Sequence, residues 1–496
     1  MMKLINLLCL ALMLVACKSV EHNTSYSPSF TESKKTTHTI SKEQQYTFGY
    51  LEVLENRAKP NGPRIKLPVY IFKSRNTDPQ LDPIIYTVGG PGSTTMPSAQ
   101  YMKYYMYLDD RDFILIEQRG TAFAQPSLDC PEWSQAVYTS NLNTDKNEKQ
   151  NELLENAAIK CKKRLTQQGI DLNSYTTTDI AADINDLVNV LKIETYNLLT
   201  ISYSTKIAQV LMRDYPERIR SVVMDSPLPL QVNYDEESVG NLLESLYAIL
   251  SDCASNAECD STYPNLKQRF YKFLTATTQN PLALNIQHPT TKKEVLFYLR
   301  GKDIINLFTS ASTAEVPHIP YEIEKILNGD LSTLETQLLQ LFQKPGPGSG
   351  IGMRLSVWCA EEYPFSSQKR IQDETTKYPE VLGLSPVVFE DEICKIWEVK
   401  KVAPIENQPI QSNIPVLVIN GEYDNETPVK WGALMTKHLR NSYHLIFKGW
   451  KHTPTTNWSN PCAMEAANDF FNDPNTLPKP DCLEAIKTPK FTLKKN

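Results

Sequence analysis

The stretch Tyr196-Asn197-Leu198-Leu199-Thr200-Ile201-Ser202-Tyr203-Ser204-Thr205 decides the fold of this chain of 496 residues. Its pattern predicts a hydrophobic strand, a tight turn with Ser202 at the apex, and the start of a helix. A nucleophile elbow presents its serine at such a turn, usually within the pattern G-x-S-x-G. Here the pattern is T-I-S-Y-S, with Thr200 and Ser204 in place of the two glycines. The role of Ser202 therefore has to be judged from the rest of the chain.

Short apolar runs bounded by turn residues lie on both sides of this stretch and predict buried strands. Apolar residues at helical spacing over 178–191 predict a helix directly before it. Strands and helices that alternate along a chain form a mostly parallel sheet with helices on both faces. We therefore expect an α/β fold, with strands predicted at 46–54, 66–73, 83–88, 113–117, 220–224, 414–420 and 443–447.

The alternation of strands and helices stops near Pro227, and the strand pattern returns only at residue 414. Between these points the apolar spacing is mostly helical. The sequence thus predicts a sheet domain made of residues 45–230 and 405–496, which a helical insert over residues 231–404 interrupts.

The N-terminus predicts export. Residues 1–14 contain Lys3 and a short apolar run, as in a signal peptide. The run ends in Leu14-Val15-Ala16-Cys17, which resembles the lipobox of bacterial lipoproteins. We expect a lipoprotein signal peptide over residues 1–17, lipid attachment at Cys17 and a flexible tether over 18–44. Lys18 favours an outer-membrane anchor facing the periplasm of a bacterial cell envelope, and an ordinary signal peptide is the alternative.

Composition narrows the possible partners. The formal net charge is −6, without the basic excess typical of proteins that bind nucleic acid. Of ten cysteines, eight remain without Cys9 in the signal peptide and Cys17 at the lipid site. An even number in an exported chain predicts disulfides, and the lack of C-x-x-C or Cys/His clusters argues against metal ligation. Many pairings are open, and the simplest is sequential: Cys130–Cys161, Cys253–Cys259, Cys359–Cys394 and Cys462–Cys482.

Two further residues complete a candidate catalytic triad with Ser202. A serine hydroxyl needs a base to take its proton, and that base is usually a histidine oriented by a carboxylate. Asp424 follows the strand predicted at 414–420, and His452 follows the strand predicted at 443–447. The order Ser, Asp, His is that of the α/β-hydrolase fold, which places these residues at the carboxyl ends of strands.

Each of these residues also has an ordinary structural interpretation. A serine between strand and helix is often a helix N-cap, and an aspartate before Thr-Pro is often a turn residue. The competing bases are His438 and His444, which lie in a predicted helix and strand, and the competing acid is Glu422. The common order and common position after strands favour the triad over these alternatives.

The tetrahedral intermediate of acyl transfer needs hydrogen-bond donors for its oxyanion. Gly89-Gly90-Pro91-Gly92 follows the strand predicted at 83–88, and the backbone amide of Gly90 is one candidate donor. The amide of Tyr203, the residue after the nucleophile, is the other. This chemistry requires no metal and no cofactor.

Four blocks resemble the exported tripeptidyl and prolyl aminopeptidase family of α/β-hydrolase serine peptidases. This resemblance implies a lid over the site, cleavage from a peptide's free N-terminus, and acidic lid residues that bind the substrate ammonium. Glu361 and Glu362 in Val357-Trp358-Cys359-Ala360-Glu361-Glu362 match that acidic stretch. The four blocks are Gly89 to Ser93, Glu117-Gln118-Arg119-Gly120-Thr121 with Pro126 to Cys130, Tyr196 to Val223, and Ile414 to His452.

The leading hypothesis is a lipid-anchored periplasmic serine aminopeptidase that removes short units from peptides with a free N-terminus. The altered elbow supports an alternative, a catalytically impaired lipoprotein that only binds peptides. A small-substrate esterase is a third possibility, because the triad chemistry of esters and peptides is the same.

Overall fold

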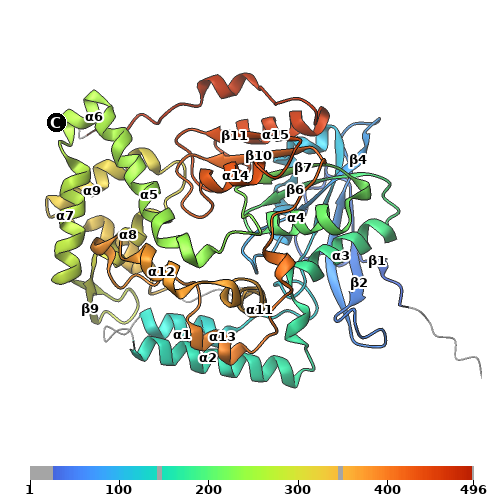
Figure 1. Ribbon diagram of the computed structural model, residues 1–496, viewed down its shortest axis with the longest axis horizontal. Helices are drawn as coiled ribbons and strands as arrows, with labels where there is room; N and C mark the ends of the chain where they lie inside the picture. Colours follow the sequence, from blue (N-terminus) through green and yellow to red (C-terminus); the bar gives the residue numbers. More distant parts are fainter. Residues whose placement is uncertain (1–25, 142–147, 344–349, 494–496) are drawn as a thin grey trace, which may run out of the picture.

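The computed structural model describes residues 26–141, 148–343 and 350–493. Its centre is a nine-stranded sheet in the order β1-β2-β3-β5-β4-β6-β7-β10-β11 (Figure 1). The pairs β1–β2, β2–β3 and β3–β5 are antiparallel, and all pairs from β5 to β11 are parallel. The expected mostly parallel α/β-hydrolase sheet is confirmed. Its strands are β1 Ser29–Glu32, β2 Tyr46–Leu54, β3 Arg64–Phe72, β4 Gln80–Thr87, β5 Arg111–Ile116, β6 Tyr196–Ile201, β7 Ile219–Asp225, β10 Val416–Gly421 and β11 Ser442–Phe447.

The central strands are apolar on both sides because helices cover both faces of the sheet. Every residue of β6 is buried, and its side chains alternate between two clusters. Leu198 joins the cluster on the face of α3 and α4, and Leu199 joins the cluster on the face of α15. This burial explains why β6 lacks the apolar–polar alternation of a one-sided strand. The helices that contribute to these two layers include α1 Pro131–Asn141, α2 Glu148–Gln167, α3 Thr177–Val190, α4 Ser204–Asp214, α14 Val429–Thr436 and α15 Cys462–Asn472.

The insert divides into two parts with different partners. Helices α5 to α10 and the hairpin β8–β9 share a separate hydrophobic cluster, which lies to one side of the sheet in Figure 1. Helices α11 and α13 instead join the core on the α3–α4 face, where Lys162 of α2 donates to Ile396 O at 3.0 Å. The insert comprises α5 Tyr234–Ser255, α6 Ala257–Thr262, α7 Leu266–Gln279, β8 Leu282–Gln287, β9 Glu294–Leu299, α8 Gly301–Thr309, α9 Ile319–Leu327, α10 Ser332–Gln340, α11 Ile351–Glu361, α12 Gln368–Thr375 and α13 Asp391–Trp397.

Two predicted boundaries need correction. Part of the expected tether belongs to the sheet, because β1 pairs with β2 and the amides of Thr37 and His38 donate to Tyr70 Oη at 3.1 Å. A buried tyrosine hydroxyl thus fixes residues that composition alone marked as flexible. The C-terminal residues assigned to the sheet domain return to the insert, where Phe491 is buried and Thr492 N donates to Pro317 O at 2.9 Å. The signal peptide, Cys17 and residues 18–25 lie outside the described residues.

Four disulfides follow the sequential pattern: Cys130–Cys161, Cys253–Cys259, Cys359–Cys394 and Cys462–Cys482. The paired cysteines are 31, 6, 35 and 20 residues apart in the sequence. Cys359–Cys394 joins α11 to α13 and thereby fixes the part of the insert that packs on the core.

The block Glu117-Gln118-Arg119-Gly120 follows β5 and contains a buried structural arginine. Arg119 is fully buried and binds Asp183 of α3 with two nitrogens, at 2.7 and 2.6 Å. Its remaining donors reach the carbonyls of Glu55 and Ser174 at 2.7 and 2.6 Å. Arg119 therefore ties the end of β5 to α3 and to two loops.

We expect Arg119→Met to lower the free energy of unfolding by about 3 kcal/mol or more, because it leaves buried acceptors without their donor. Urea unfolding with intact disulfides, followed by tryptophan fluorescence, measures this change. Arg64→Met is the matched control, since the Arg64–Glu52 pair is exposed and should contribute less than about 1 kcal/mol. Equal losses in the two variants would contradict the assigned role of Arg119.

Candidate active site

Ser202 occupies the apex of the predicted turn between β6 and α4. Its φ of 56° lies in the left-handed region, which side chains other than glycine adopt rarely. The turn is held because Ser202 N donates to the carbonyl of Asp225, at the end of β7, at 2.9 Å. This strained strand-to-helix turn is typical of a nucleophile elbow.

The two residues that replace the elbow glycines are accommodated by hydrogen bonds. Thr200 is buried and donates through Oγ1 to Val223 O at 3.2 Å. Ser204 is also buried, and its Oγ lies 2.8 Å from Thr87 O and accepts from Ile201 N at 2.9 Å. Each hydroxyl thus has hydrogen-bond partners in the neighbouring backbone, and the elbow forms without glycine at either position.

The close approach that needs a glycine occurs instead on the neighbouring loop. A Cβ on Gly89 would lie 2.6 Å from Ser202 Cβ and 2.9 Å from Ile201 O, which no side chain tolerates. Gly89 therefore lets the loop after β4 pass directly beside Ser202. The pattern G-x-S-x-G predicts glycines at positions 200 and 204, whereas in the folded chain the position that requires a glycine is Gly89.

His452 and Asp424 form the expected pair. His452 Nδ1 lies 2.8 Å from Asp424 Oδ2, on the loops after β11 and β10. Asp424 is buried, and the amides of Glu426 and Thr427 donate to its Oδ1 at 2.9 and 3.0 Å. Thr427 Oγ1 also donates to Oδ2 at 2.9 Å. These bonds fix the carboxylate beside the imidazole.

The pKa shifts of Asp424 and His452 agree with the hydrogen bond between them. Burial alone would raise the pKa of Asp424, but the attraction of His452 and the hydrogen bonds from Thr427 hold it below its usual value. Burial would lower the pKa of His452, but the Asp424 carboxylate and its hydrogen bond raise it above 6.5. The pair therefore favours an ionised aspartate beside a basic imidazole.

The competing residues have other roles. His444 Nε2 contacts Asn420 Oδ1 at 2.9 Å within the sheet, and Glu422 accepts from Gly449 N at 2.8 Å. His438 contacts Gln411 at 3.4 Å on the exposed surface. None of these three lines the cavity that contains Ser202.

Ser202, His452 and Gly90 line one cavity of about 690 Å³. Within the described residues no hydrogen bond joins Ser202 to His452, a contact that often tightens only when substrate binds.

Two residues at and just after the end of β7, which sequence reasoning missed, position the loop after β11 that carries His452, here called the histidine loop. Asp225 Oδ2 accepts from Thr455 N at 2.8 Å, and Ser226 Oγ accepts from Thr453 N at 2.8 Å.

The polar end of β7 could have been found in the sequence, because Asp225-Ser226-Pro227 directly follows a predicted strand. Asp225 is fully buried beneath the site, and this burial raises its pKa to about 7, although hydrogen bonds from Thr455 oppose the shift. Its function here is to hold the histidine loop, since its carboxylate is occupied by Thr455.

The glycine-rich loop is held at both ends by the block after β5. Gln118 Nε2 donates to Val88 O at 2.5 Å, and Glu117 accepts from Thr95 N at 2.8 Å. In the described part of the chain, the amides of Gly90 and Tyr203 have no hydrogen-bond partner. Both residues border the nucleophile, so both amides remain candidate donors for an oxyanion.

The predicted ammonium-binding residues do not face this cavity. Glu361 is buried and accepts from Thr177 N and Oγ1, each at 2.6 Å. Glu362 is buried in an ion pair with Lys206 and accepts from Tyr234 N at 3.2 Å. Their assignment as substrate-binding residues is therefore corrected, because both carboxylates are used to attach α11 to α3, α4 and α5.

Three other charged side chains line the Ser202 cavity: Arg354, Glu426 and Lys451. Glu426 is exposed and accepts from Tyr234 Oη at 2.8 Å. Lys451 is buried beside Asn425, and desolvation lowers its pKa to about 8 against the attraction of Asp424 and Glu426. Sequence reasoning missed all three, since no local pattern marks them.

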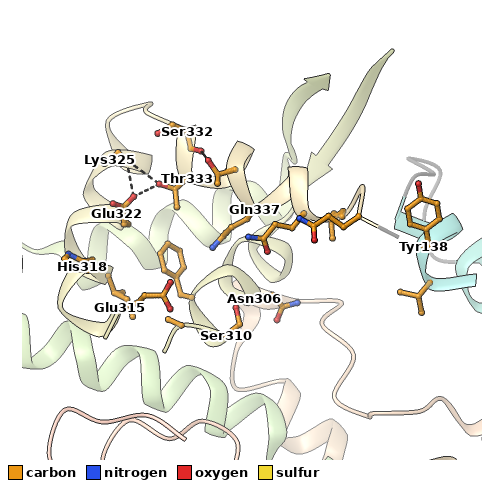
Figure 2. Close-up of a pocket in the computed structure, with 18 of the residues that line it drawn as sticks. Tyr138, Asn306, Ser310, Glu315, His318, Glu322, Lys325, Ser332, Thr333 and Gln337 are labelled. Carbon is orange, nitrogen blue, oxygen red and sulfur yellow. Dashed lines mark hydrogen bonds and ion pairs between the residues drawn. The ribbon is translucent and has the colours of Figure 1, made fainter. Parts of the chain in front are cut away.

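A larger cavity of about 1190 Å³ lies between α1 and the helices of the insert. Figure 2 shows Tyr138 on one side of it and Asn306, His318 and Gln337 on the other. The two cavities share Ser310 and Ala311 in their walls, so they adjoin at the loop after α8. The smaller cavity contains the reactive groups.

Residues 26–141, 148–343 and 350–493 contain neither a candidate metal site nor a candidate membrane span. No three His, Cys, Asp or Glu side chains there are grouped closely enough to hold a metal ion. No helix in these ranges is both long enough and apolar enough to span a bilayer.

Two family models match the chain. Residues 82–287 match the alpha/beta hydrolase fold, and residues 381–482 match TAP-like protein. The first range contains Ser202, and the second contains Asp424 and His452. The family models therefore cover all three residues of the candidate triad.

Two named relatives align with most of this chain. The serine protease Hip1 of Mycobacterium tuberculosis is 20% identical over 435 residues, which cover 82% of this chain and 81% of that protein. The tripeptidyl aminopeptidase of Streptomyces coelicolor is 22% identical over 452 residues, which cover 85% and 80%. Among solved structures, a proline iminopeptidase of Mycobacterium smegmatis has a TM-score of 0.39 and 14% identity, covering 86% of this chain and 98% of that one.

We expect His452 to titrate above pH 6.5 because the ionised Asp424 stabilises the imidazolium. Asp424→Asn should move the titration to lower pH, since the largest opposing attraction is then lost and desolvation by burial outweighs the smaller attractions of Glu426 and Asp225. NMR of labelled histidine measures both. His444 is the internal control: burial holds its pKa below 6.5, and Asp424→Asn should not move it. An unchanged His452 titration would contradict the assigned pairing.

Proposed function

We propose that this chain, which is an α/β-hydrolase-fold serine peptidase of the tripeptidyl-aminopeptidase-like family, releases short units from the free N-terminus of peptides. The observation that carries the proposal is the position of Ser202 at a strained elbow, in one cavity with a histidine that is bonded to Asp424. The relatives named as a serine protease and a tripeptidyl aminopeptidase support the same class of reaction.

In the proposed mechanism Ser202 Oγ attacks the scissile carbonyl carbon while His452 takes the hydroxyl proton. Because Nδ1 of His452 faces Asp424, Nε2 is the nitrogen available to the serine. The same nitrogen then delivers the proton to the leaving amine, and an acyl-enzyme forms on Ser202. Water, activated by His452, hydrolyses this ester and restores the free hydroxyl.

The amides of Gly90 and Tyr203 are the proposed oxyanion donors. Preformed donors stabilise charge that develops on the carbonyl oxygen without reorganisation during the reaction. Gln118 and Glu117 act as positioning residues, because they hold the two ends of the loop that carries Gly90.

Glu426 takes the place of Glu361 and Glu362 in the proposal. It is the one carboxylate side chain in the described wall of the Ser202 cavity, and it is exposed. A carboxylate there can bind the substrate ammonium through a charge-assisted hydrogen bond. The adjoining larger cavity, which meets the first at Ser310 and Ala311, offers space for the peptide beyond the scissile bond.

We also propose that the protein is anchored by a lipid on Cys17 to a bacterial outer membrane and faces the periplasm. Support comes from the lipobox-like Leu14-Val15-Ala16-Cys17 and from four disulfides, which persist in oxidising compartments.

An esterase would use the same triad, so substrates separate the two activities. We expect turnover of aminoacyl or tripeptidyl anilides with a free N-terminus to exceed that of short acyl esters. Ser202→Ala should lower kcat by at least about 10⁴-fold and abolish labelling by a fluorophosphonate, because the attacking atom is lost. Ser261→Ala, an exposed serine of the insert, is the control and should keep both activities. A wild-type protein that neither reacts with the probe nor turns over a peptide would refute the proposal.

Glu426→Gln should raise KM for substrates with a free N-terminus by about tenfold or more, because the ammonium loses a charged partner. Steady-state kinetics should show no comparable change with the N-acetylated form of an ester substrate, which carries no ammonium. Glu392→Gln, an exposed residue of α13, serves as the charge control. Equal effects on free and acetylated substrates would remove Glu426 from ammonium binding.

A further inference from the structure

Arg354 is a half-buried cation in the wall of the Ser202 cavity. It lies on α11, and its Nε is buried without a hydrogen-bond acceptor. No salt bridge of the described residues includes its guanidinium. Desolvation lowers the pKa of Arg354, and Tyr234, Glu426 and Asp235 attract the guanidinium without a salt bridge to either carboxylate. A desolvated cation whose Nε lacks an acceptor, in a cavity wall, points to a ligand that supplies that acceptor.

The guanidinium is held in position. Its Cζ lies 5.6 Å from the ring centre of Trp358, whose Nε1 donates to Asp235 at 3.1 Å. At the base of the side chain, a Cβ on Gly92 would lie 3.5 Å from Arg354 Cβ, so α11 packs against the glycine-rich loop. Arg354 is therefore placed directly beside the loop that carries the proposed oxyanion donor.

The two carboxylates that attract Arg354, Asp235 and Glu426, form no salt bridge with it in the described structure. Asp235 uses its two oxygens for Trp358 Nε1 and for Val388 N, and burial raises its pKa to about 7. Glu426 accepts from Tyr234 and makes no ion pair with Arg354 in the described structure. Lys451 adds a second cation to the same wall. The cavity thus has two cationic side chains and one carboxylate.

We propose that Arg354 is a specificity-determining residue that binds a substrate carboxylate close to the scissile bond. The proposal rests on the proposed peptidase function and names its substrate class. Peptides with a free N-terminus and a nearby carboxylate match Glu426 and Arg354 at the same time. A guanidinium suits this ligand because its planar donors bind both oxygens of a carboxylate.

Such a carboxylate has two sources, an acidic side chain near the N-terminus or the free C-terminus of a short peptide. Three tetrapeptides separate them: Ala-Glu-Ala-Ala amide, Ala-Gln-Ala-Ala amide, and Ala-Gln-Ala-Ala with a free C-terminus. Calorimetric titration of the full chain carrying Ser202→Ala measures their binding without turnover.

We expect one of the two carboxylate peptides to bind about tenfold more tightly than the neutral Ala-Gln-Ala-Ala amide, as charged hydrogen bonds allow. Adding Arg354→Met should remove this preference, and adding Arg354→Lys should restore part of it. Arg370→Met, which removes an exposed cation of α12, is the matched control and should keep the preference.

Equal binding of all three peptides to the Ser202→Ala chain would overturn the proposal, whether or not Arg354→Met folds. A carboxylate preference that persists in a folded Arg354→Met variant would also overturn it. These outcomes differ from failure of the proposed function, which is the absence of peptide turnover and of fluorophosphonate labelling in the wild-type enzyme.

Discussion

The turn at Ser202 is the constraint on which the rest of the site depends. A residue with a side chain adopts a φ of 56° there, and the surrounding structure must stabilise it. The carbonyl of Asp225 holds the Ser202 amide, and Gly89 leaves space for the Ser202 side chain. The carboxylate of the same Asp225 holds Thr455 in the histidine loop. One buried residue at the end of β7 therefore couples the position of Ser202 to that of the loop that carries His452.

The insert is attached to this site by buried charges. Glu361 binds Thr177 at the start of α3, and Glu362 pairs with Lys206 in the helix that follows the elbow. A buried ion pair contributes little net stability, because the cost of desolvating both charges offsets their attraction. Here the buried charges orient α11 so that Arg354 enters the cavity beside the glycine-rich loop. The charged side chains in the wall of the Ser202 cavity are Arg354, Glu426, Lys451 and His452, and not the acidic pair at the end of α11.

The sequence predicted most of the sheet strands closely, because apolar runs bounded by turn residues mark them. The predicted strand 46–54 agrees with β2, and the two loops that carry Asp424 and His452 follow β10 and β11 as expected. Prediction failed where the decisive partner is distant in the chain. Residues 29–38 look flexible by composition, but β2 and the hydroxyl of Tyr70 bind them. Glu361 looks like an acidic binding residue until Thr177, far along the chain, occupies its carboxylate.

The sequence by itself determined the α/β fold, the order of the candidate triad and the position of each triad residue after a strand, because these follow from local hydrophobic periodicity and turn chemistry. Only the tertiary structure decided how an elbow forms without its glycines, since Gly89 lies on the loop after another strand, β4. It also decided which charges face the cavity. That distinction arises because a carboxylate or guanidinium is free or occupied according to neighbours that folding alone brings together.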